Sequence, residues 1–216
     1  MPEKELPQVE DKDPMYFGYY GQLQHQQNML ADHIRTSTYQ NAILANKDIF
    51  KDAIVMDLGA GSGILSYFAV QAGAKKVYAV EASGAAKRIQ QLCDSAHHGK
   101  NSFLKDKIEI IHSKIEDMTV KIPKVDILIS EPIGVLVFHE RMIESFLYAR
   151  DHYLKPNGHV LPNKSIMYFA PFSDATLYSE TLQKARFWEN TNFYNIDFSP
   201  LANEAVHGIC NSFRVF

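Results

Sequence analysis

The sequence predicts an α/β fold in which a parallel β-sheet is covered by helices on both faces. Three observations predict it. Short, continuously apolar segments alternate with segments whose apolar residues recur at helical spacing. A glycine-rich turn, GAGSG at residues 59–63, directly follows the first apolar segment. Glu81 lies at the end of one further segment of this kind and Glu131 directly follows another, and open α/β sheets bind ligands at the carboxyl ends of their strands.

Five segments are expected to form the sheet. Strands buried on both faces are continuously apolar, and these segments have that pattern. They are residues 53–58 (AIVMDL), 76–82 (KVYAVEA), 107–113 (KIEIIHS), 125–130 (VDILIS) and a fifth that begins with HVLP at 159–162, after a turn at KPNG.

Helices are expected between the strands. In residues 64–73, Ile64, Leu65 and Phe68 share a face and Gly73 is a C-cap. The segments that follow are a polar helix over about 84–97, a loop at HHGKNSFLKD (97–106) and an amphipathic helix at ERMIESFLYARDHYL (140–154).

The two ends of the chain differ from this central pattern. Residues 1–14 are polar and proline-containing, and we expect a flexible segment there. From Met15 the pattern is helical, with Leu23, Leu30 and Ile34 on one face.

A second unit is expected after the fifth strand. SIMYFAPF (165–172) alternates like an antiparallel strand, SDATLYSETLQKARFW (173–188) has a helical pattern, and the remainder looks irregular. We therefore expect one domain over residues 15–161 and the start of another over 162–216.

The composition excludes several classes of protein. The formal charge of −3 argues against a general nucleic-acid surface, which needs a basic face. Cys93 and Cys210 are far apart, which excludes a disulfide scaffold and suits a reducing compartment, and neither these nor the nine histidines have metal-ligand spacing. No apolar run has the length of a membrane span, and the N-terminus is unlike a signal peptide. We expect a soluble intracellular protein with no metal and no membrane contact.

The glycine turn has the features of a nucleotide-cofactor loop. Gly59, Gly61 and Gly63 let the backbone approach a ligand closely, and Glu81 lies where an acid can accept hydrogen bonds from ribose hydroxyls. The spacing is G-x-G-x-G, with Asp57 before it, rather than the dinucleotide pattern G-x-G-x-x-G. The negative charge of Asp57 suits a cationic ligand, so S-adenosylmethionine is favoured over NAD, which is the alternative. In the alternative interpretation, the glycines only form an ordinary tight turn between a strand and a helix and bind no ligand.

Three motifs together resemble the protein arginine methyltransferases. They are VMDLGAGSGILSYFAVQAGAKKVYAVEAS, SEPIGVLVFHERMIES and the helix YFGYYGQLQHQQNMLADHIRTSTYQNAI, which is most similar to the coactivator-associated, type I branch. The resemblance covers about residues 15–200. It implies a Rossmann-like class I S-adenosylmethionine-dependent methyltransferase domain with an N-terminal helical lid, followed by a β-barrel domain with a dimerisation arm.

The resemblance implies that Glu131 and Glu140 are the catalytic residues of a double-glutamate loop that binds the substrate guanidinium. Physical chemistry agrees with such a pair. The guanidinium and the sulfonium donor are both cations, and two carboxylates offset their repulsion. They also match the planar donors of guanidinium and so orient the attacking nitrogen. In the alternative interpretation, Glu140 is a favourable acid at a helix N-terminus beside Arg141, and Glu131 is merely solvated.

The remaining site residues are also implied by the resemblance. Arg35 is expected to pair with the cofactor carboxylate and Glu116 to bind the adenine amine. Taken alone, the aromatic residues and methionines would be interpreted as core side chains. The implied cofactor contacts are Tyr16, Phe17, Gln26, Arg35, Asp57, Gly59, Gly61, Glu81, Ala82, Glu116 and Ser145, and the implied substrate contacts are Tyr20, Met29 and Met142.

The sequence departs from the family pattern at several positions. Val135, Ile133 and His139 stand where tyrosine, methionine and asparagine are usual, which alters the wall of the substrate channel. The chain reaches only the first part of the barrel and of the dimerisation arm. We therefore expect cofactor binding to survive in this chain, with methyl transfer weak or absent without the rest of the barrel.

The resemblance implies transfer of methyl groups to arginine in histones or RNA-binding proteins, giving asymmetric dimethylarginine, by a homodimer of the nucleus and cytoplasm without direct nucleic-acid contact. Two alternatives remain open. One is an impaired fragment or regulator that binds cofactor and pairs with an active relative. The other is methylation of a small molecule, which needs no double-glutamate loop.

Overall fold

The computed structural model describes residues 13–97 and 99–212, so most of the expected flexible segment 1–14 lies outside the described residues. The chain divides into two compact units, the first ending at Met167 and the second beginning at Tyr168. Within the described ranges, no helix is both long and apolar enough to span a bilayer.

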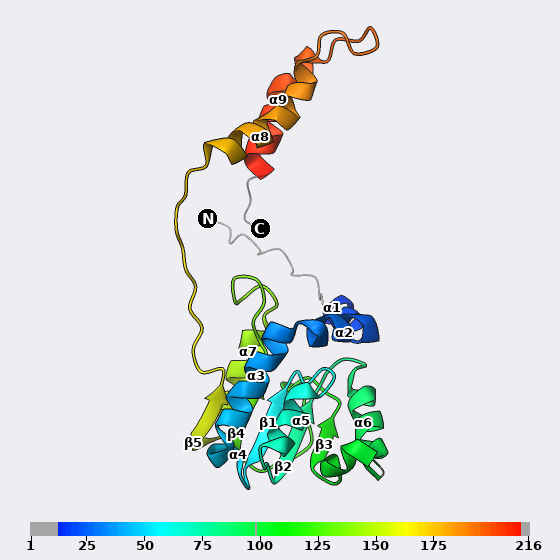
Figure 1. Cartoon of the computed structure of the whole chain (residues 1–216), viewed down its shortest axis with the longest axis vertical. Helices are drawn as coiled ribbons and strands as arrows, with labels where there is room; N and C mark the ends of the chain where they lie inside the picture. Colours follow the sequence, from blue (N-terminus) through cyan, green and yellow to red (C-terminus); the bar gives the residue numbers. More distant parts are fainter. Residues whose placement is uncertain (1–12, 98, 213–216) are drawn as a thin grey trace, which may run out of the picture. The chain divides into compact units, whose positions relative to one another are not determined.

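The first unit contains a five-stranded sheet with the order β3-β2-β1-β4-β5 (Figure 1). All four pairings are parallel, which confirms the predicted α/β fold. The strands are β1 Ile54–Leu58, β2 Lys76–Val80, β3 Ile108–Ile111, β4 Val125–Ser130 and β5 Leu154–Leu161. Four of them lie within the predicted segments; β5 begins earlier than expected.

The early start of β5 has a local reason. Val125 pairs with Leu154 and Ile127 with His159, so the KPNG residues form an irregularity within the strand and not a turn before it. An added Cβ at Gly158 would lie 2.5 Å from the Leu154 side chain, so glycine allows the strand to fold closely there.

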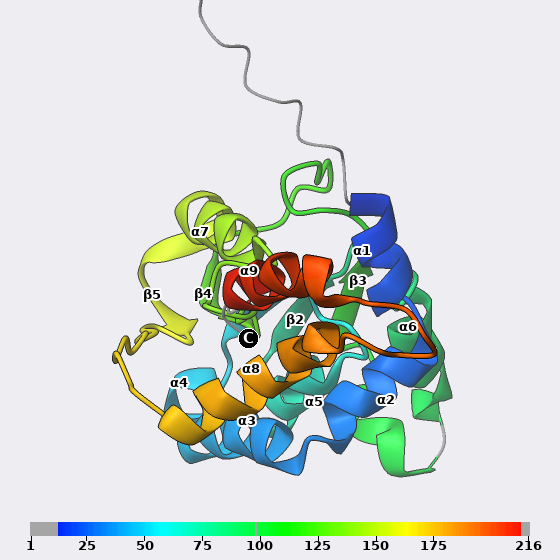
Figure 2. The same cartoon turned by 90° about the horizontal axis from the view of Figure 1, so that it is seen from above.

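Helices cover both faces of the sheet, as Figure 2 shows for α5 and α7. One core contains Phe68 and Ala69 of α5 (Ile64–Gln71) and Ile89 of α6 (Ala86–Asp94), with Ile43 of α3 (His33–Ala45). The other core lies under Phe146 and Ala149 of α7 (Met142–Tyr153). Successive side chains along the strands point alternately into these two cores, as expected for a sheet that is buried on both sides.

The remaining elements of the first unit are helical. The expected helical N-terminus is present, but Leu23 and Ile34 are 63% and 82% exposed, so the predicted apolar face does not enter the core. The predicted loop over residues 97–106 contains 3-10 helical turns instead, because its short turns bury Leu104. The bounds are α1 Asp13–Tyr20, α2 Leu23–Ala31, α4 Lys47–Phe50, η1 Ser95–His97 and η2 Gly99–Leu104.

The second unit is a helical hairpin. Its helices are α8 Ala175–Arg186 and α9 Ala202–Ser212, with η3 Phe187–Glu189 and η4 Ser199–Leu201 between them. Phe187 and Trp188 make edge contacts near the turn, with ring centroids 5.4 Å apart. The helical prediction for residues 173–188 is confirmed.

Two predictions for this part of the sequence are wrong. Residues 165–172 form no strand; Tyr168 and Phe169 are 89% and 97% exposed, and an extended segment needs a neighbouring strand to satisfy its backbone groups. The stretch expected to be irregular ends in α9, because Ala202, Ala205 and Val206 recur at helical spacing and are partly buried.

Candidate functional site

The predicted site residues converge on the carboxyl edge of the sheet. Asp57 lies near the end of β1, and the strands that flank β1 are β2 and β4. Glu81 directly follows β2 and Glu131 directly follows β4. The two acids therefore lie on opposite sides of the central strand, at the position where the strand order reverses and where open sheets of this kind bind ligands.

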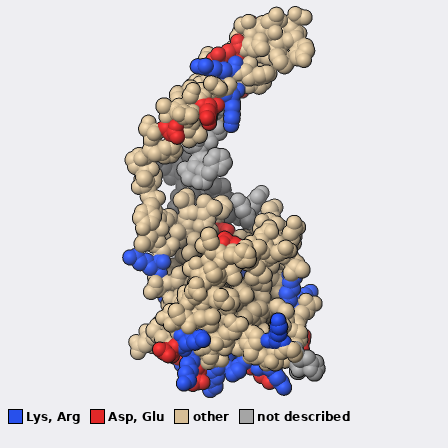
Figure 3. Space-filling model, in the orientation of Figure 1, with Lys and Arg blue, Asp and Glu red and all other residues tan. Residues whose placement is uncertain are grey.

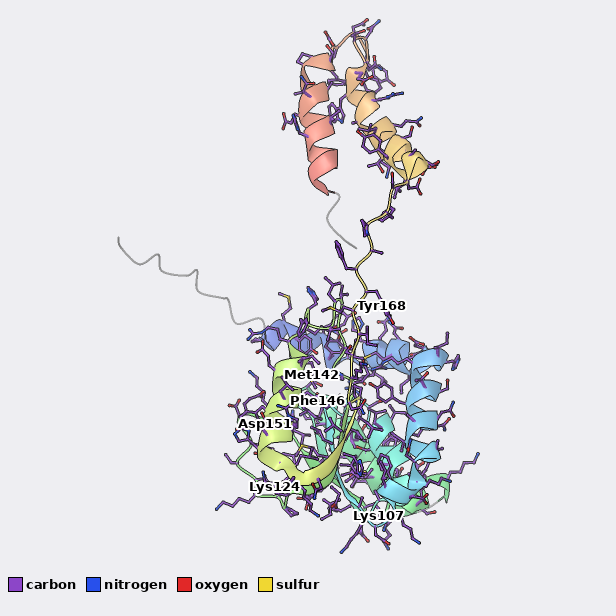
Figure 4. All side chains as sticks on the ribbon, turned by 90° about the vertical axis from the view of Figure 1, so that its left-hand side faces the viewer. Lys107, Lys124, Met142, Phe146, Asp151 and Tyr168 are labelled. Atoms are coloured by element: carbon purple, nitrogen blue, oxygen red, sulfur yellow. The ribbon has the colours of Figure 1, made fainter. Side chains whose placement is uncertain are left out.

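The glycine turn makes room for side chains from two other elements. Gly59 and Gly61 have φ angles of 67° and 56°, which favour glycine. An added Cβ at Gly59 would lie 2.4 Å from Met142 Cε, and one at Gly61 would lie 2.8 Å from Gln26 Oε1. The turn is thus in contact with the lid, through Gln26, and with α7, through Met142, which Figure 4 labels.

Glu81 is held by backbone donors. Its carboxylate accepts hydrogen bonds from the Gly61 N–H at 2.7 Å and from the Ser83 N–H at 2.6 Å, and the residue is 6% exposed. A carboxylate has further lone pairs after these two bonds. Glu81 can therefore still accept from two adjacent hydroxyls while the glycine turn keeps its orientation fixed.

Asp57 is a buried carboxylate with one satisfied oxygen. It is 0% exposed, and its Oδ2 accepts a hydrogen bond from Ser66 Oγ at 2.7 Å. Its Oδ1 is buried without a hydrogen-bond partner among the described residues. Burial raises the pKa of Asp57 to about 7, against the opposing effect of the Ser66 bond. A cationic ligand beside the turn would favour the ionised form.

Glu131 is paired with Arg35 of α3. Arg35 donates from Nε at 3.1 Å and from Nη2 at 2.5 Å, both to Glu131 Oε2. The other oxygen of Glu131 accepts from the Ile133 N–H at 3.3 Å, and Arg35 Nη1 donates to the Met29 backbone carbonyl at 3.2 Å. The two charged side chains are 29% and 23% exposed, so the pair is partly shielded from water.

Glu140 is held by two tyrosines of the lid. Tyr16 Oη and Tyr20 Oη donate to the same oxygen, Glu140 Oε2, at 3.0 and 2.9 Å. Burial raises the pKa of both hydroxyls, and the adjacent Glu140 raises it further. Both tyrosines therefore remain neutral donors, and Glu140 is anchored to the lid helix α1.

The loop that joins the two glutamates has an unusual backbone. Leu136, Val137 and Arg141 have φ angles of 52°, 68° and 58°, in the left-handed region. Gly134 lies so close to Glu140 that an added Cβ would be 2.8 Å from its Cγ. The loop is thus tightly folded around Glu140.

The helix that Glu140 was expected to open begins slightly later. α7 starts at Met142 with Arg141 as its N-cap, so Glu140 belongs to the loop. Arg141 forms an ion pair with Glu144 at 2.7 Å. The hydrogen bonds that Glu140 accepts from the lid favour the site interpretation over that of a simple helix-terminal acid.

Glu116 and Ser145 are brought together although they are far apart in sequence. Ser145 Oγ donates to Glu116 Oε1 at 2.5 Å. This contact joins the loop after β3 to α7. The resemblance had implied both as neighbours of the adenine.

The other implied residues have weaker connections to this site. Lys114 Nζ lies 5.5 Å from the centroid of the Phe17 ring, and Tyr16 packs edge-on against the same ring. Ala82 is half-buried directly after Glu81. Met29 contributes its backbone carbonyl to Arg35.

Three residues in the site were not predicted from the sequence. Ser66 bonds Asp57, Ser83 donates its backbone N–H to Glu81, and Tyr39 lies close enough to Glu131 for its charge to affect the hydroxyl. Burial raises the pKa of Tyr39 first, followed by the charge of Glu131. Only Tyr39 had a usable signal, because it lies one helical turn after Arg35 on α3.

The arrangement gathers hydrogen-bond acceptors and negative charge around the glycine turn. Glu81 and Glu116 present acceptors, Asp57 and Glu131 flank the turn, and Glu140 is fixed from the lid. Among residues 13–97 and 99–212, no group of three His, Cys, Asp or Glu side chains is placed to hold a metal ion.

The comparisons with known proteins agree with this site. A model of the ribosomal protein L11 methyltransferase (PrmA) family matches residues 21–134. The histone-arginine methyltransferase CARMER of Drosophila persimilis is 50% identical over 198 residues, which are 91% of this chain and 36% of that protein. The chain thus spans about a third of the length of this curated relative.

Solved structures give the same result. Protein arginine methyltransferase 10 of Arabidopsis thaliana has a TM-score of 0.70 and 34% identity, over 90% of this chain and 56% of that chain. The Trypanosoma brucei PRMT1 enzyme–prozyme heterotetrameric complex with AdoHcy has the same TM-score and identity, over 86% and 55%.

The relatives divide by the length of the match. The L11 methyltransferase model covers the cofactor half, whereas the arginine methyltransferases match both the glycine turn and the double-glutamate loop. The chain belongs to the methyltransferase family that this model describes, and over most of its length it is similar to protein arginine methyltransferases.

Proposed function

We propose that this chain is the catalytic domain of an S-adenosylmethionine-dependent protein arginine N-methyltransferase. The observation that carries the proposal is the placement of Glu131 and Glu140. One is fixed at the end of β4 by Arg35 and the other in the adjoining loop by Tyr16 and Tyr20, beside the glycine turn. Residues that a small-molecule methyltransferase does not need are therefore positioned and oriented here.

The residues of the glycine turn fit the cofactor. The orphaned Oδ1 of the buried Asp57 suits a cationic nucleoside close to the turn. Glu81 is the ribose acceptor, Glu116 and Ser145 the adenine contacts, and Arg35 the partner of the carboxylate. When bound, S-adenosylmethionine supplies a methyl group on a positively charged sulfur. The description of the Trypanosoma brucei relative as a complex with AdoHcy supports this assignment.

The remaining implied residues complete the proposed site. Tyr16, Phe17 and Gln26 belong to the lid on the cofactor side, and Ala82 lines the turn after β2. We assign Tyr20, Met29 and Met142 to the substrate side.

The two glutamates bind and orient the substrate guanidinium. Each offers an oxygen to the planar donor group, which fixes the direction of the remaining nitrogen. Their negative charges offset the repulsion between two cations in a partly desolvated site, where electrostatic interactions are stronger than in water. Glu140 can accept the proton that the substituted guanidinium releases, because it is held in place by neutral hydroxyls.

The substrates are proteins that carry arginine, such as histones and RNA-binding proteins, and the product is asymmetric dimethylarginine. The name of the Drosophila persimilis relative supports a histone substrate. Modification of histones would take place in the nucleus, which supports a nuclear location. We propose that the protein is also present in the cytoplasm.

We assign residues 15–161 to the methyltransferase domain and 162–216 to the start of the barrel domain with its dimerisation arm. The division of the chain at Met167 and Tyr168 supports a boundary near this point. The hairpin of α8 and α9 is the proposed arm of a homodimer. The heterotetrameric assembly of the Trypanosoma brucei relative supports oligomerisation.

A second function is favoured by one observation. The Trypanosoma brucei relative is a complex of an enzyme with a prozyme, so a chain of this fold can belong to an assembly with a regulatory member. In that case this chain would bind cofactor and act by pairing with an active arginine methyltransferase.

Binding experiments on the chain test the proposal. Isothermal titration calorimetry with S-adenosylhomocysteine measures the cofactor site, and titration of the complex with a histone-tail peptide measures the second site. We expect Glu140→Gln to weaken binding of the arginine peptide at least about tenfold, because hydrogen bonds to charged groups contribute about 1.5–3 kcal/mol. It should change S-adenosylhomocysteine affinity much less.

A matched control and a matched ligand complete this test. Glu144→Gln alters an exposed acid on α7 that pairs with Arg141, and it should leave both affinities unchanged. A peptide with lysine in place of arginine should bind weakly to every variant. Equal binding of the two peptides by the unaltered chain would refute a guanidinium site.

A further inference from the structure

Lysines of the first unit gather at one edge of its sheet, where acidic side chains are also present but fewer. The proposed site at the carboxyl edge contains several acids. At the opposite edge, where the strands begin, a lysine lies close to the first residue of every strand. Figure 3 shows basic side chains gathered at that end of the unit. We call this surface the amino-edge face and define it by Lys47, Lys51, Lys75, Lys76, Lys105, Lys107, Lys121, Lys124 and Lys155.

The lysines gather at this edge because of the topology of the sheet. All strands of a parallel sheet run in the same direction, so the residues that precede them meet at one edge. Figure 4 labels Lys107, before β3, and Lys124, before β4, and both lie at the end of the unit away from Met142. Residues separated in sequence thus form one continuous surface.

Ion pairs neutralise only part of this face. Lys76 pairs with Glu109 at 3.1 Å and Lys155 with Asp126 at 2.6 Å. Lys124 donates to the backbone carbonyl of His152, an acceptor without formal charge. Other acids near the face are Asp48, Asp52, Asp94, Asp106 and Asp151, the last paired with Arg150. Among the described residues, the lysines of the face without a carboxylate partner are Lys47, Lys51, Lys75, Lys105, Lys107, Lys121 and Lys124. The face is therefore clearly positive.

The surface is hollowed on one side. A cavity of about 510 Å³ opens between the starts of β1 and β5. Lys51, Lys155, Asn157 and His159 contribute donors to its lining, and Asp126 and Asp52 contribute acids. Because Lys155 is paired with Asp126, Lys51 is the ammonium group of this lining that could approach a phosphate at the rim of the cavity.

The side chains of this face indicate which polyanion it fits. Binding of single-stranded nucleic acid relies on several aromatic platforms, whereas the exposed large apolar residues next to these lysines in sequence are Phe103 and Val120. Protein interfaces rely on aromatic and arginine anchors, and this face consists of lysines. Lysine is a point charge suited to phosphate oxygens, which carry no sequence information.

We propose that the amino-edge face binds the phosphate backbone of double-stranded nucleic acid without reading its sequence. The net charge of −3 argued against nucleic-acid binding. A net charge, however, does not show how the charged side chains are distributed over the surface. Binding at this face leaves the carboxyl edge accessible, since the two edges lie at opposite ends of the strands. Duplex and cofactor should therefore bind together.

Fluorescence anisotropy with a labelled 20-base-pair DNA duplex of mixed sequence tests the proposal. The affinity of the chain should fall steeply between 25 and 200 mM NaCl. With roughly five phosphates contacted, the slope of log K against log salt concentration should be about −4 to −5. Changing the duplex sequence should alter the affinity less than about threefold, because the contacts are to phosphates.

Charge-reversal variants locate the surface. Lys105→Glu, Lys107→Glu and Lys124→Glu together should weaken duplex binding at least about tenfold and reduce the salt slope by about 3. The matched control is Lys87→Glu, Lys164→Glu and Lys184→Glu, which makes the same change in net charge at exposed positions elsewhere. It should retain most of the affinity. If both triple variants lose affinity equally, total charge and not this face controls binding.

Further outcomes separate this inference from its competitors. If circular dichroism shows that the reversed variant is unfolded, the corresponding Lys→Gln triple variant must reproduce the loss. Tighter binding to a single strand, or equal competition by polyglutamate, would overturn the duplex assignment. No binding at 25 mM NaCl would refute the proposal. Glu131→Gln should leave duplex binding unchanged, so the result does not depend on the proposed enzyme function.

Discussion

Arg35 directs two donors, Nε and Nη2, to the same carboxylate oxygen of Glu131. The second oxygen of Glu131 accepts a backbone N–H, so the carboxylate is oriented from two sides. Glu140 is fixed differently, by the neutral hydroxyls of Tyr16 and Tyr20. The two glutamates thus have partners of different charge, and substitutions of those partners should have different effects.

Arg35→Lys should weaken binding of S-adenosylhomocysteine. Lysine keeps the charge but lacks the planar donors that orient Glu131 and that we assign to the cofactor carboxylate. The loss should be roughly tenfold or more, measured by isothermal titration calorimetry. Arg150→Lys, at an exposed pair with Asp151, is the control and should leave the affinity unchanged. Unchanged affinity in Arg35→Lys would argue against a direct role.

Tyr20→Phe should weaken arginine-peptide binding through Glu140. It removes one hydrogen bond from a neutral hydroxyl to a carboxylate, which contributes about 1.5–3 kcal/mol, and leaves the aromatic ring in place, so we expect a loss of roughly tenfold or more. Combining it with Tyr16→Phe removes both donors and should have a larger effect than the sum of the two. The peptide affinity is measured by calorimetry in the presence of S-adenosylhomocysteine. Tyr194→Phe, at a side chain that is 85% exposed, should behave like the unaltered chain.

Gly134→Ala should disturb the acceptor side of the site alone. The new Cβ would meet Glu140 Cγ at 2.8 Å and the Glu140 backbone N at 3.1 Å, so the loop must shift. Peptide binding should fall while S-adenosylhomocysteine affinity stays within about twofold. Gly84→Ala is the matched control because nothing lies within 4 Å of its added Cβ. Equal effects of the two substitutions on peptide binding would contradict the role of the Gly134 contact.

Asp57 should make the stability of the chain depend on pH. Its pKa is raised by burial to about 7, from an ordinary value of 3.8, so the folded state holds a proton that the unfolded state releases in this interval. Because the native state binds more protons, the free energy of unfolding should fall as pH rises from about 4 to 7. Asp57→Asn should remove this contribution, which amounts to a few kcal/mol at most, as measured by urea unfolding at several pH values.

The control for this experiment is Asp126, whose contribution to stability changes with pH in the opposite direction. Burial disfavours the ionised form of Asp126, but the hydrogen bonds from Lys155 and the Ile54 N–H, together with the charge of Lys155, outweigh it and lower the pKa. Asp126→Asn should therefore remove a contribution that is present above about pH 4 and is lost as the pH falls below it. If Asp57→Asn leaves the pH dependence between 4 and 7 unaltered, the carboxyl group of Asp57 does not titrate there.

Much of the first unit was predictable from the sequence because its signals are local. The strands that form β1 to β4 are buried on both faces, so their apolar runs are continuous. The glycine turn at residues 59–63 has no helical or extended alternative. The second unit was less predictable: SIMYFAPF alternates as a strand would, but a strand also needs a partner, and the sequence does not show whether one is present.

The site residues divide in the same way. Glu81 and Glu131 could be placed because each follows a strand, and position in a parallel sheet determines the edge. The bonds from Ser66 to Asp57 and from Ser145 to Glu116 join separate elements, so no spacing in the sequence indicates them. The N-terminal helices were expected from periodicity, but their exposed apolar residues show that they are positioned by polar contacts with the loop as well.

Several residues with left-handed backbone conformations lie in the loop between the two glutamates. The position of Glu140 can therefore change among related proteins more easily than the position of Glu131. Glu131 directly follows β4, so a shift of Glu131 would disturb the sheet and the glycine turn beside it. Glu140 depends on a short loop with strained positions at Leu136, Val137 and Arg141, where a change of sequence can alter the backbone locally. Related enzymes could therefore adjust the width available to an incoming side chain by changing this loop, while methyl-donor recognition stays the same.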